Sequence, residues 1–378
     1  MKIITIDEKK LIVKSLKSKL SKIGYEVQTA RTGKEGIELL KTFKPDLVTI
    51  DINMSNLEGI DVLKYIKEAG LNTKVMVITG EKEEGVITDL FDYGVDEYIK
   101  KPATLSEIII KINKLVGMCA VPDEVFEEEK SIIRERCIGV VIPCYNEEDR
   151  LLTNRFVSFV KHNVGYYLCF VNDGSTDNTL QVLEELREGK EDYIDVFNCE
   201  KNGGKAEAVR QGMLHLANDK DLALDYIGFL DADLSTDLND FDDLVKTIDA
   251  YNYKVVSGSR ISRMGANITK ASARQVISLT INYIIRKILG MKFKDTQCGA
   301  KVLDKDVIPS LFKDKFITRW LFDVEMFLRL KKQYGERAKE LIYEQPLKRW
   351  VHADGSKLSM RDSLKIGSQL FRIATHYK

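Results

Sequence analysis

Two short apolar runs that each end in an aspartate constrain the fold of this chain more than any other feature. The run "LVTI" (47–50) leads into Asp51, and the run "IGFL" (227–230) leads into Asp231. A carboxylate at the tip of a buried strand is costly unless the tip opens onto water, a metal ion or a ligand. We therefore expect two metal sites, each at a strand end and each in its own domain.

Around the first run, short β-branched segments alternate with helical patterns. Such an alternation predicts a doubly wound parallel sheet, whose sites form at the carboxyl ends of the strands. The expected strands are residues 2–6, 25–29, 46–50, 74–78 and 96–100, and a helix over 106–116 closes the unit.

A second series of strands follows a charged segment. Residues 118–136 hold Pro122 and a dense run of charges, which indicates a linker that could be partly helical. No internal repeat is visible, so we expect two unlike α/β domains, 1–117 and 137–378, joined by this linker. The strands expected in the second domain are residues 138–143, 166–171, 193–198, 226–230 and 253–258.

Composition limits the partners and the location. The 378-residue chain has a formal net charge of zero, so no overall positive charge favours the binding of nucleic acid. No signal-peptide pattern and no apolar run of about 18 residues is present, so we expect a cytoplasmic protein without a transmembrane helix. The six cysteines include no CxxC pair, which favours reduced thiols over a disulfide framework or a zinc site.

Polar residues gather at the predicted carboxyl edge of the first sheet. Asp7, Glu8 and Asp51 would crowd three carboxylates into one pocket, and a hard cation such as Mg²⁺ relieves their repulsion. A metal-bound Asp51 would then attack a phosphoryl donor, and Thr79 and Lys101 would bind the phosphoryl oxygens. The pattern predicts a phosphate switch.

Four segments of this domain, "TIDEKKLI", "LVTIDINMSNLEG", "VMVITGEK" and "DEYIKKPA", resemble the receiver domain of two-component response regulators. The resemblance covers about the first 117 residues and implies a flavodoxin-like (βα)5 fold. It implies that a histidine kinase or a phosphotransfer protein phosphorylates Asp51, and that Tyr98 is an aromatic switch. The Mg²⁺ ligands that it implies are Asp7, Glu8, Asp51 and the backbone carbonyl of Asn53.

The chain departs from the receiver pattern at three positions. Glu8 stands for the commoner second Asp, Ser55 for Pro, and Glu58 for the Asp before Gly59. None of these changes removes a required group. The alternative is a degenerate receiver that serves only as a docking module.

Motifs of the second domain suit a nucleotide-sugar donor. In "VVIPCYNEEDRL" (140–151), residues 147–149 suit a helix N-terminus, and in "FVNDGSTDNTL" (170–180), Asp173 can accept from a base or a ribose. The segment "EKNGGKAEAVRQGM" (200–213) places two glycines and Lys205 before a helix, which favours a diphosphate. In "FLDADLST", Asp231 and Asp233 suit Mg²⁺ or Mn²⁺ on that diphosphate.

This set resembles a family 2 glycosyltransferase of the GT-A fold, the Rossmann-like fold of nucleotide-diphospho-sugar transferases. The later segments "VVSGSR", "KDTQCGAKVL", "RWLFDVEM" and "WVHADGSKL" resemble the polyprenyl- or dolichyl-phosphate glucosyltransferase branch. The likeness runs from about Ile138 to the end of the chain and favours UDP-glucose as donor. The donor contacts that it implies are Pro143, Tyr145, Glu147, Asp173 and Lys205.

The same resemblance assigns the metal and the acceptor. Asp231 and Asp233 would hold the metal with Ser235 nearby, and Arg260, Arg319 and Lys357 would bind an acceptor phosphate. The segment "DLSTDLND" lacks the Pro that often follows such a pair, and Ala206 stands where Gly is common. These departures concern the geometry of loops rather than the chemistry.

The resemblance implies an inverting transfer to one of two acceptor classes. A lipid phosphate such as polyprenyl phosphate is already anionic, so that arginine need only position it. A hydroxyl would require a carboxylate to accept its proton, and Asp295 and Asp323 are unranked candidates.

Two amphipathic segments, 271–292 and 357–378, fit either a lipid interface or packing within the protein, so a peripheral position at the inner membrane face is one expectation. A homodimer is another, through the face of the fourth and fifth receiver strands. The main interpretation is a phosphorylation-regulated glycosyltransferase. The alternative is a two-component output protein whose transferase-like domain binds a nucleotide sugar or a partner without turnover.

Overall fold

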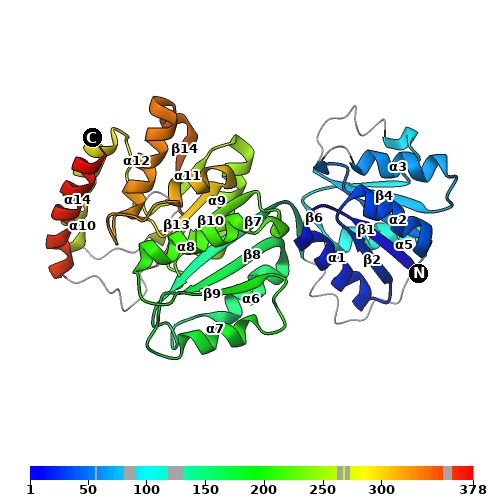
Figure 1. Ribbon diagram of the computed structural model, residues 1–378, viewed down its shortest axis with the longest axis horizontal. Coiled ribbons are helices and arrows are strands. Elements are labelled where there is room, and N and C mark those ends of the chain that lie inside the picture. The colour runs from blue at the N-terminus through cyan, green and yellow to red at the C-terminus, as the bar shows by residue number, and fades with distance from the viewer. Residues whose placement is uncertain are drawn as a thin grey trace. The chain divides into compact units, whose positions relative to one another are not determined.

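The computed structural model describes residues 1–55, 58–80, 90–117, 131–261, 267–268, 273–351 and 360–377. The chain forms two compact α/β units (Figure 1). The first comprises Met1–Cys137, Asn154–Tyr167 and Lys220–Ala223, and the second comprises Ile138–Thr153, Leu168–Asp219 and Leu224–Lys378.

The first unit contains a five-stranded sheet with the order β2-β1-β3-β4-β5. All neighbouring strands are parallel, so their carboxyl ends meet at one edge. The strands are β1 (Lys2–Ile6), β2 (Glu26–Ala30), β3 (Leu47–Ile50), β4 (Lys74–Thr79) and β5 (Glu97–Lys100). The helices described here are α1 (Lys10–Lys22), α2 (Gly33–Phe43), α3 (Glu58–Glu68) and α5 (Leu105–Val116).

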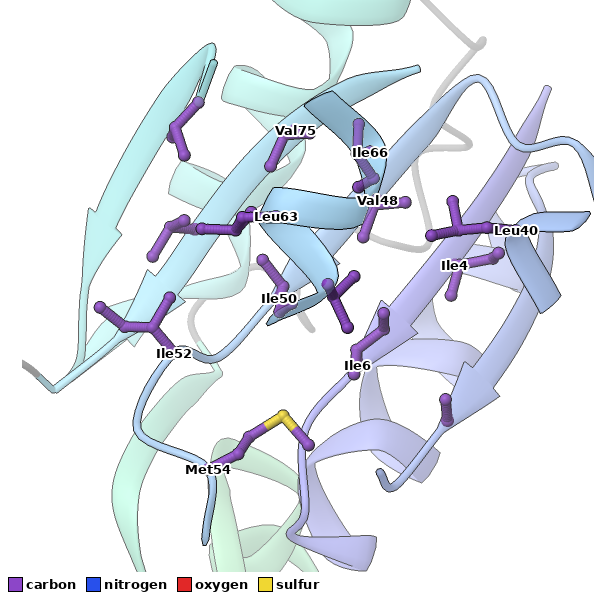
Figure 2. Packing of buried hydrophobic residues seen from close by; sticks show 14 of the residues in the cluster. Ile4, Ile6, Leu40, Val48, Ile50, Ile52, Met54, Leu63, Ile66 and Val75 are labelled. Carbon is purple, nitrogen blue, oxygen red and sulfur yellow. The ribbon is translucent and has the colours of Figure 1, made fainter. Parts of the chain in front are cut away.

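Branched apolar side chains form the core on one face of this sheet, as Figure 2 shows. Ile4 and Ile6 of β1 pack with Val48 and Ile50 of β3, and the buried side of α3 covers them. A one-residue slip of any strand would turn these side chains to the opposite face. The core therefore fixes which residues follow each strand at the carboxyl edge.

The second sheet follows the path β14-β11-β13-β10-β7-β8-β9, and β6 (Ala103–Thr104) pairs with β7 off this path. Strand β13 runs antiparallel to both β10 and β11, which brings the residue before β13 to the carboxyl end of β10. The strands are β7 (Ile132–Cys144), β8 (Asn163–Asn172), β9 (Ile194–Asn198), β10 (Tyr226–Leu230), β11 (Val255–Ser259), β13 (Ala300–Asp304) and β14 (Ile342–Pro346).

Helices cover the second sheet, and a two-stranded pair, β12 (Asn267–Ile268) with β15 (Arg349–Trp350), lies apart from it. None of the helices in the described ranges combines the length and the apolar character that crossing a membrane requires. The helices are α6 (Thr153–His162), α7 (Thr179–Arg187), α8 (Lys205–Asn218), α9 (Leu238–Tyr251), α10 (Ala273–Leu289), α11 (Ile308–Phe312), α12 (Phe322–Tyr334), α13 (Ala338–Leu341) and α14 (Met360–His376).

Two local expectations are wrong. Residues 132–136 of the expected linker belong to β7, because buried Ile133 and Cys137 anchor a strand that its charged residues conceal in the sequence; residues 118–130 lie outside the described part. Residues 148–150 form a turn directly after Glu147, and α6 begins only at Thr153. Asn146 takes a left-handed conformation there, with φ of 51°, which ends the extended chain before any helix starts.

Candidate functional site

Lys101 joins two carboxylates at the carboxyl edge of the first sheet. Its Nζ lies 2.6 Å from Asp7 Oδ2 and 2.7 Å from Asp51 Oδ2, and all three side chains are buried. Burial raises the pKa of Asp51, but the Lys101 ammonium outweighs burial and leaves this pKa below its ordinary value. Burial together with the neighbouring Asp51 charge raises the pKa of Asp7. Asp51 is thus an ionised carboxylate at neutral pH.

The surroundings of Asp51 fit a phosphoryl group. Thr79 ends β4 with a fully buried hydroxyl that makes no hydrogen bond of good geometry to a described residue, yet lies close enough to Asp51 to help lower the pKa of that carboxylate. A further oxygen bound at Asp51 would give this hydroxyl a better partner. Asp51 Oδ1 also accepts from the Asn53 amide at 2.9 Å. Tyr98, on β5, is half-buried against the receiver core.

Glu8 is directed toward a different partner from the one expected. Its Oε2 accepts from the Ser55 amide at 2.9 Å and from the Ser55 hydroxyl at 2.8 Å, so this carboxylate points to the loop after β3 rather than to Asp7 and Asp51. The longer Glu side chain reaches the loop after β3, where a Ser supplies two donors. Magnesium coordination by Glu8 therefore requires these two hydrogen bonds to open.

In the second unit, Asp231 follows β10 and pairs with Lys205, the first residue of α8. The Asp231 amide donates to the Gly299 carbonyl at 3.0 Å, and a Cβ at position 299 would lie 1.9 Å from Asp231 Oδ2. Only glycine allows this approach, which explains the Gly of "DTQCG". Asp233 Oδ1 accepts from the Ser235 amide at 2.9 Å. The two carboxylates of Asp231 and Asp233, the DxD segment, thus lie in one fixed loop.

A glycine loop leads into α8, and Asp173 holds it. Its two carboxylate oxygens accept from the Gly203 amide at 2.8 Å and from the Gly204 amide at 2.9 Å. Gly204 has φ of 83°, a conformation that favours glycine. Burial raises the pKa of Asp173. The carboxylate expected to meet a base or ribose therefore also shapes the loop at the N-terminus of α8, where amides and helix dipole favour a diphosphate.

Arg319 lies against this glycine loop. A Cβ at Gly204 would be 3.4 Å from Arg319 Cδ, and the charge of Arg319 acts on Asp173. The preceding turn is held by buried Glu325, which accepts from the amides of residues 317 and 318 at 2.9 Å each. Arg319, expected at the acceptor phosphate, is therefore placed beside the donor loop.

Arg150 is a cation that the sequence motifs did not single out. It forms a bidentate pair with Glu147, three residues earlier, with contacts of 2.7 to 2.9 Å. These hydrogen bonds raise the pKa of Arg150, and the charge of Asp233 adds to the effect. Glu147 thus positions a guanidinium near the DxD loop. The other expected donor residues, Pro143 and Tyr145, lie at and just after the end of β7.

Arg260 follows β11 and is clamped by Asp295. Its Nε lies 2.7 Å from Asp295 Oδ2 and its Nη2 2.8 Å from Oδ1, while its backbone amide donates to Oδ2 at 2.9 Å. Burial raises the pKa of Asp295, but Arg260 outweighs burial and lowers that pKa to about 2. The ring of Trp350 lies 5.5 Å from the guanidinium carbon. The clamp uses Nε and Nη2 of the guanidinium, and no hydrogen bond of Nη1 to a residue in the described part of the chain competes for an anion there.

Glu344 supports this clamp and was missed, because β14 was not among the expected strands. Its Oε1 accepts from the Ser259 hydroxyl at 2.7 Å and from the Asp295 amide at 2.6 Å, and its Oε2 accepts from the Lys294 amide at 2.9 Å. The acidic residue inside "LIYEQP" is the only local signal that could have indicated it. Glu344 therefore fixes the backbone on both sides of the clamp.

Asp323, the other candidate base, is buried at the start of α12. Its Oδ1 lies 2.7 Å from Nζ of Lys301, which is itself fully buried on β13, in the geometry of an ion pair rather than a hydrogen bond. Burial raises the pKa of Asp323 although the charge of Lys301 lowers it. The charge of Lys205 also lowers this pKa, and the charge of Asp231 raises it. Lys357, the third expected acceptor residue, lies outside the described part of the chain.

Comparisons with known proteins agree with this two-part arrangement. Residues 3–113 match the family model described as the response regulator receiver domain. Residues 139–312 match the model described as glycosyl transferase family 2.

Individual relatives divide in the same way. The dolichyl-phosphate beta-glucosyltransferase of Saccharomyces cerevisiae is 30% identical over 262 residues, which are 64% of this chain and 75% of the relative. The Drosophila melanogaster protein of the same name is 30% identical over 256 residues, with 64% and 75% covered. The cell cycle transcriptional regulator CtrA of Caulobacter vibrioides is 31% identical over 116 residues, 31% of this chain and half of the relative.

Proposed function

This chain belongs to the family 2 glycosyltransferases and carries a response-regulator receiver domain, and from this premise we propose that it transfers glucose from UDP-glucose to a polyprenyl phosphate under control of phosphorylation at Asp51. The proposal for the transfer rests on one observation. Asp231 of the DxD loop pairs with Lys205 at the start of the helix that the glycine loop opens. A nucleotide diphosphate bound there meets amides, an ammonium and two carboxylates that suit a metal.

The ligand atoms that the loop of Asp231 and Asp233 offers fit a divalent cation. Asp231 and Asp233 supply hard oxygen ligands, and the ammonium of Lys205 already neutralises one of them. Mg²⁺ or Mn²⁺ held by these carboxylates would neutralise charge on the departing diphosphate. In this proposal the N-terminus of α8, the Lys205 ammonium and Arg319 bind that diphosphate, and Asp173 keeps the loop in place by accepting from its glycine amides.

The acceptor class follows from the two candidate bases. Asp295 is held by Arg260 through both oxygens and has a pKa of about 2, so it is a poor proton acceptor. Asp323 is buried in an ion pair with Lys301. The low pKa of Asp295 argues against it as a base; the pKa of Asp323 is raised, but this side chain is buried and paired with Lys301, so both observations favour an acceptor that is already anionic.

In the proposed reaction, an acceptor phosphate oxygen attacks the anomeric carbon from the face opposite the diphosphate. One carbon–oxygen bond forms while the bond to the UDP oxygen breaks, so the configuration inverts and no proton moves. Arg260, whose clamp engages only Nε and Nη2 among the described contacts, would orient the attacking phosphate. Lys357, outside the described residues, is kept as a second phosphate contact.

A peripheral position at the cytoplasmic membrane face would bring the enzyme to such an acceptor. Tyr283, Arg286, Lys287, Lys292 and Lys294 line one shallow hollow at the end of α10. Basic residues beside an exposed aromatic suit anionic headgroups. In α14, by contrast, Leu370 and Ile373 are buried, so that part of its apolar side is used in packing.

In the receiver, Asp7, Asp51 and the Asn53 carbonyl suit Mg²⁺, joined by Glu8 once it leaves Ser55. The buried hydroxyl of Thr79 and the ammonium of Lys101 would bind the oxygens of a phosphoryl group on Asp51. The donor of that group would be a histidine kinase or a phosphotransfer protein. Since both domains are in one chain, we propose that the added charge changes transferase activity or oligomeric state.

The deciding experiment measures transfer of labelled glucose into an organic-extractable product from UDP-glucose and polyprenyl phosphate with Mn²⁺. Wild type should form this product, Asp233→Ala should not, and Asp314→Ala, an exposed acidic residue elsewhere, should be unaffected. A wild type without turnover that still binds UDP-glucose would favour the alternative of a non-catalytic output protein. Undiminished transfer by Asp233→Ala would contradict the metal assignment, and preference for GDP-mannose would overturn the donor.

A further inference from the structure

Three metal-ligating side chains of different chemistry converge on the far strands of the second sheet. Cys169 on β8, Asp195 on β9 and His215 on α8 each place one ligand atom within 4.8 Å of the others. Cys169 and Asp195 are direct partners in the parallel pairing of β8 with β9. His215 Nε2 lies 2.7 Å from Asp195 Oδ2. These residues have no part in the donor or acceptor machinery.

Packing alone does not explain the surroundings of the Cys169 thiol in this cluster. It is completely inaccessible, and it makes no hydrogen bond to any residue that the structure describes. Burial, followed by the negative charge of Asp195, raises its pKa well above the usual range. A cysteine needed only for packing does not require a carboxylate and an imidazole beside its sulfur, whereas a cation would use all three groups.

We propose that Cys169, Asp195 and His215 bind one Zn²⁺ ion. Sulfur, nitrogen and oxygen ligands together suit borderline-soft Zn²⁺, whereas Mg²⁺ prefers oxygen alone. The thiol gives up its proton on binding, so the cation and its two anionic ligands sum to zero charge, which suits a largely buried site. A Zn²⁺ ion between Nε2 and Oδ2 replaces the proton that these atoms now share.

The geometry needs only a small adjustment, in which the Nε2–Oδ2 pair opens from 2.7 Å to admit the ion. Metal–ligand bonds of about 2.0 to 2.3 Å place tetrahedral ligands about 3.5 Å apart, which rotation of the Asp195 and His215 side chains can reach. Asp195 Oδ1 accepts from the Val196 amide at 2.8 Å, which holds the carboxylate and leaves Oδ2 for the ion. The side chains of Asp195 and His215 are 24% and 38% exposed, so solvent supplies an entry path and a fourth ligand.

The consequence is structural. Strand β9 ends the sheet, so one of its edges has no neighbouring strand in the path. An ion shared by β8, β9 and α8 would tie this last strand to the sheet and to the helix that begins at the donor loop. Zinc should therefore raise the melting temperature of the full chain without being required for sugar transfer.

The test loads the full chain with Co²⁺ or Zn²⁺ in excess Mg²⁺, which keeps the carboxylate sites of both domains occupied. Wild type should retain one equivalent of Zn²⁺ after gel filtration, and its Co²⁺ form should develop a sulfur-to-cobalt charge-transfer band. His215→Gln changes a partly exposed helix residue, so it should fold, yet lose that equivalent. Cys169→Ser should lose the band, while Cys137→Ser, another buried cysteine, should keep both signals.

Two results would overturn the site. One is a wild type that retains no more Zn²⁺ than His215→Gln. The other is a Co²⁺ form without the charge-transfer band, which would exclude a thiolate ligand even if the ion is retained. Should Cys169→Ser fail to fold, His215→Gln decides alone.

Discussion

The carboxylate of Glu8 accepts two hydrogen bonds from Ser55, one from its amide and one from its hydroxyl. These are two of the three positions at which the receiver sequence departs from its family pattern. The departures are therefore a matched pair: the longer acidic side chain reaches a partner that the usual proline could not provide, because proline has neither an amide hydrogen nor a hydroxyl. This pair competes with metal binding by Glu8.

Removing the Ser55 hydroxyl should therefore strengthen Mg²⁺ binding to the receiver. One hydrogen bond is worth about 1 kcal/mol, so Ser55→Ala should lower the Mg²⁺ dissociation constant roughly fivefold. Calorimetry in an Asp233→Ala background isolates the receiver site. Equal affinities would mean that Glu8 takes no part in coordination.

Phosphorylation of Asp51 should change the activity or the oligomeric state of the transferase. Beryllofluoride with Mg²⁺ should change the rate of sugar transfer or the oligomeric state of wild type, and do nothing to Asp51→Ala. Thr79→Ala should weaken the response, because the buried hydroxyl that meets the new oxygens is lost. If wild type binds the mimic and neither property moves, the receiver is a docking module.

Glu344 should position the acceptor site. Glu344→Ala removes three hydrogen bonds from the turn that clamps Arg260, so the KM for polyprenyl phosphate should rise about tenfold or more while the affinity for UDP-glucose is retained. Glu344→Gln keeps one acceptor oxygen and should recover part of the loss. Glu340→Ala, an exposed neighbour, is the control. Equal loss of donor and acceptor affinity would indicate a merely structural role.

Arg319 should act on the donor. Because its side chain lies on Gly204, Arg319→Ala should weaken UDP-glucose binding measured by calorimetry and leave the acceptor KM unchanged. The control is Arg337→Ala, which removes another exposed arginine in the C-terminal part of the chain. It should alter neither the affinity for UDP-glucose nor the acceptor KM. The opposite pattern would restore Arg319 to the acceptor phosphate.

Asp295 should make stability depend on pH in an acidic window. Its folded-state pKa of about 2 lies below the unfolded value of about 3.9, so the pair with Arg260 stabilises fully above the unfolded value. This stabilisation is lost as the pH falls through the folded value. Asp295→Asn should therefore reduce the free energy of unfolding by about 2 kcal/mol at pH 7. Denaturant titrations should find the difference narrowing below pH ~4.

Much of both folds could be predicted from the sequence because the signals are local. An apolar run that ends in Asp51 or Asp231 specifies a strand and its tip within a few residues, and "NGG" before Lys205 specifies a loop and a helix start. The strand edge then follows from the parallel topology alone. Expectations of this kind need no knowledge of distant partners.

The supporting residues could not be predicted because their partners are remote in the chain. Glu344 holds residues about 50 and 85 positions away, as the hydrogen bonds to Asp295 and Ser259 demonstrate. Cys169 and Asp195 meet across a strand pair and carry no short motif. Lys301 and Glu344 lie on β13 and β14, two strands that were not among those expected.

The reversed strand β13 separates the proposed acceptor clamp from its support along the polypeptide. Arg260 and Asp295 of the clamp precede this strand, whereas Glu344 and Trp350, which contact the clamp, follow it. The region matched by the transferase family model ends at residue 312, before either of them. If the proposed assignment holds, exchanging the chain after β13 would replace the support of the acceptor clamp and, apart from Arg319, keep every residue proposed to bind the donor. A chimera joined at that point would therefore change the choice of acceptor before it changes the choice of sugar.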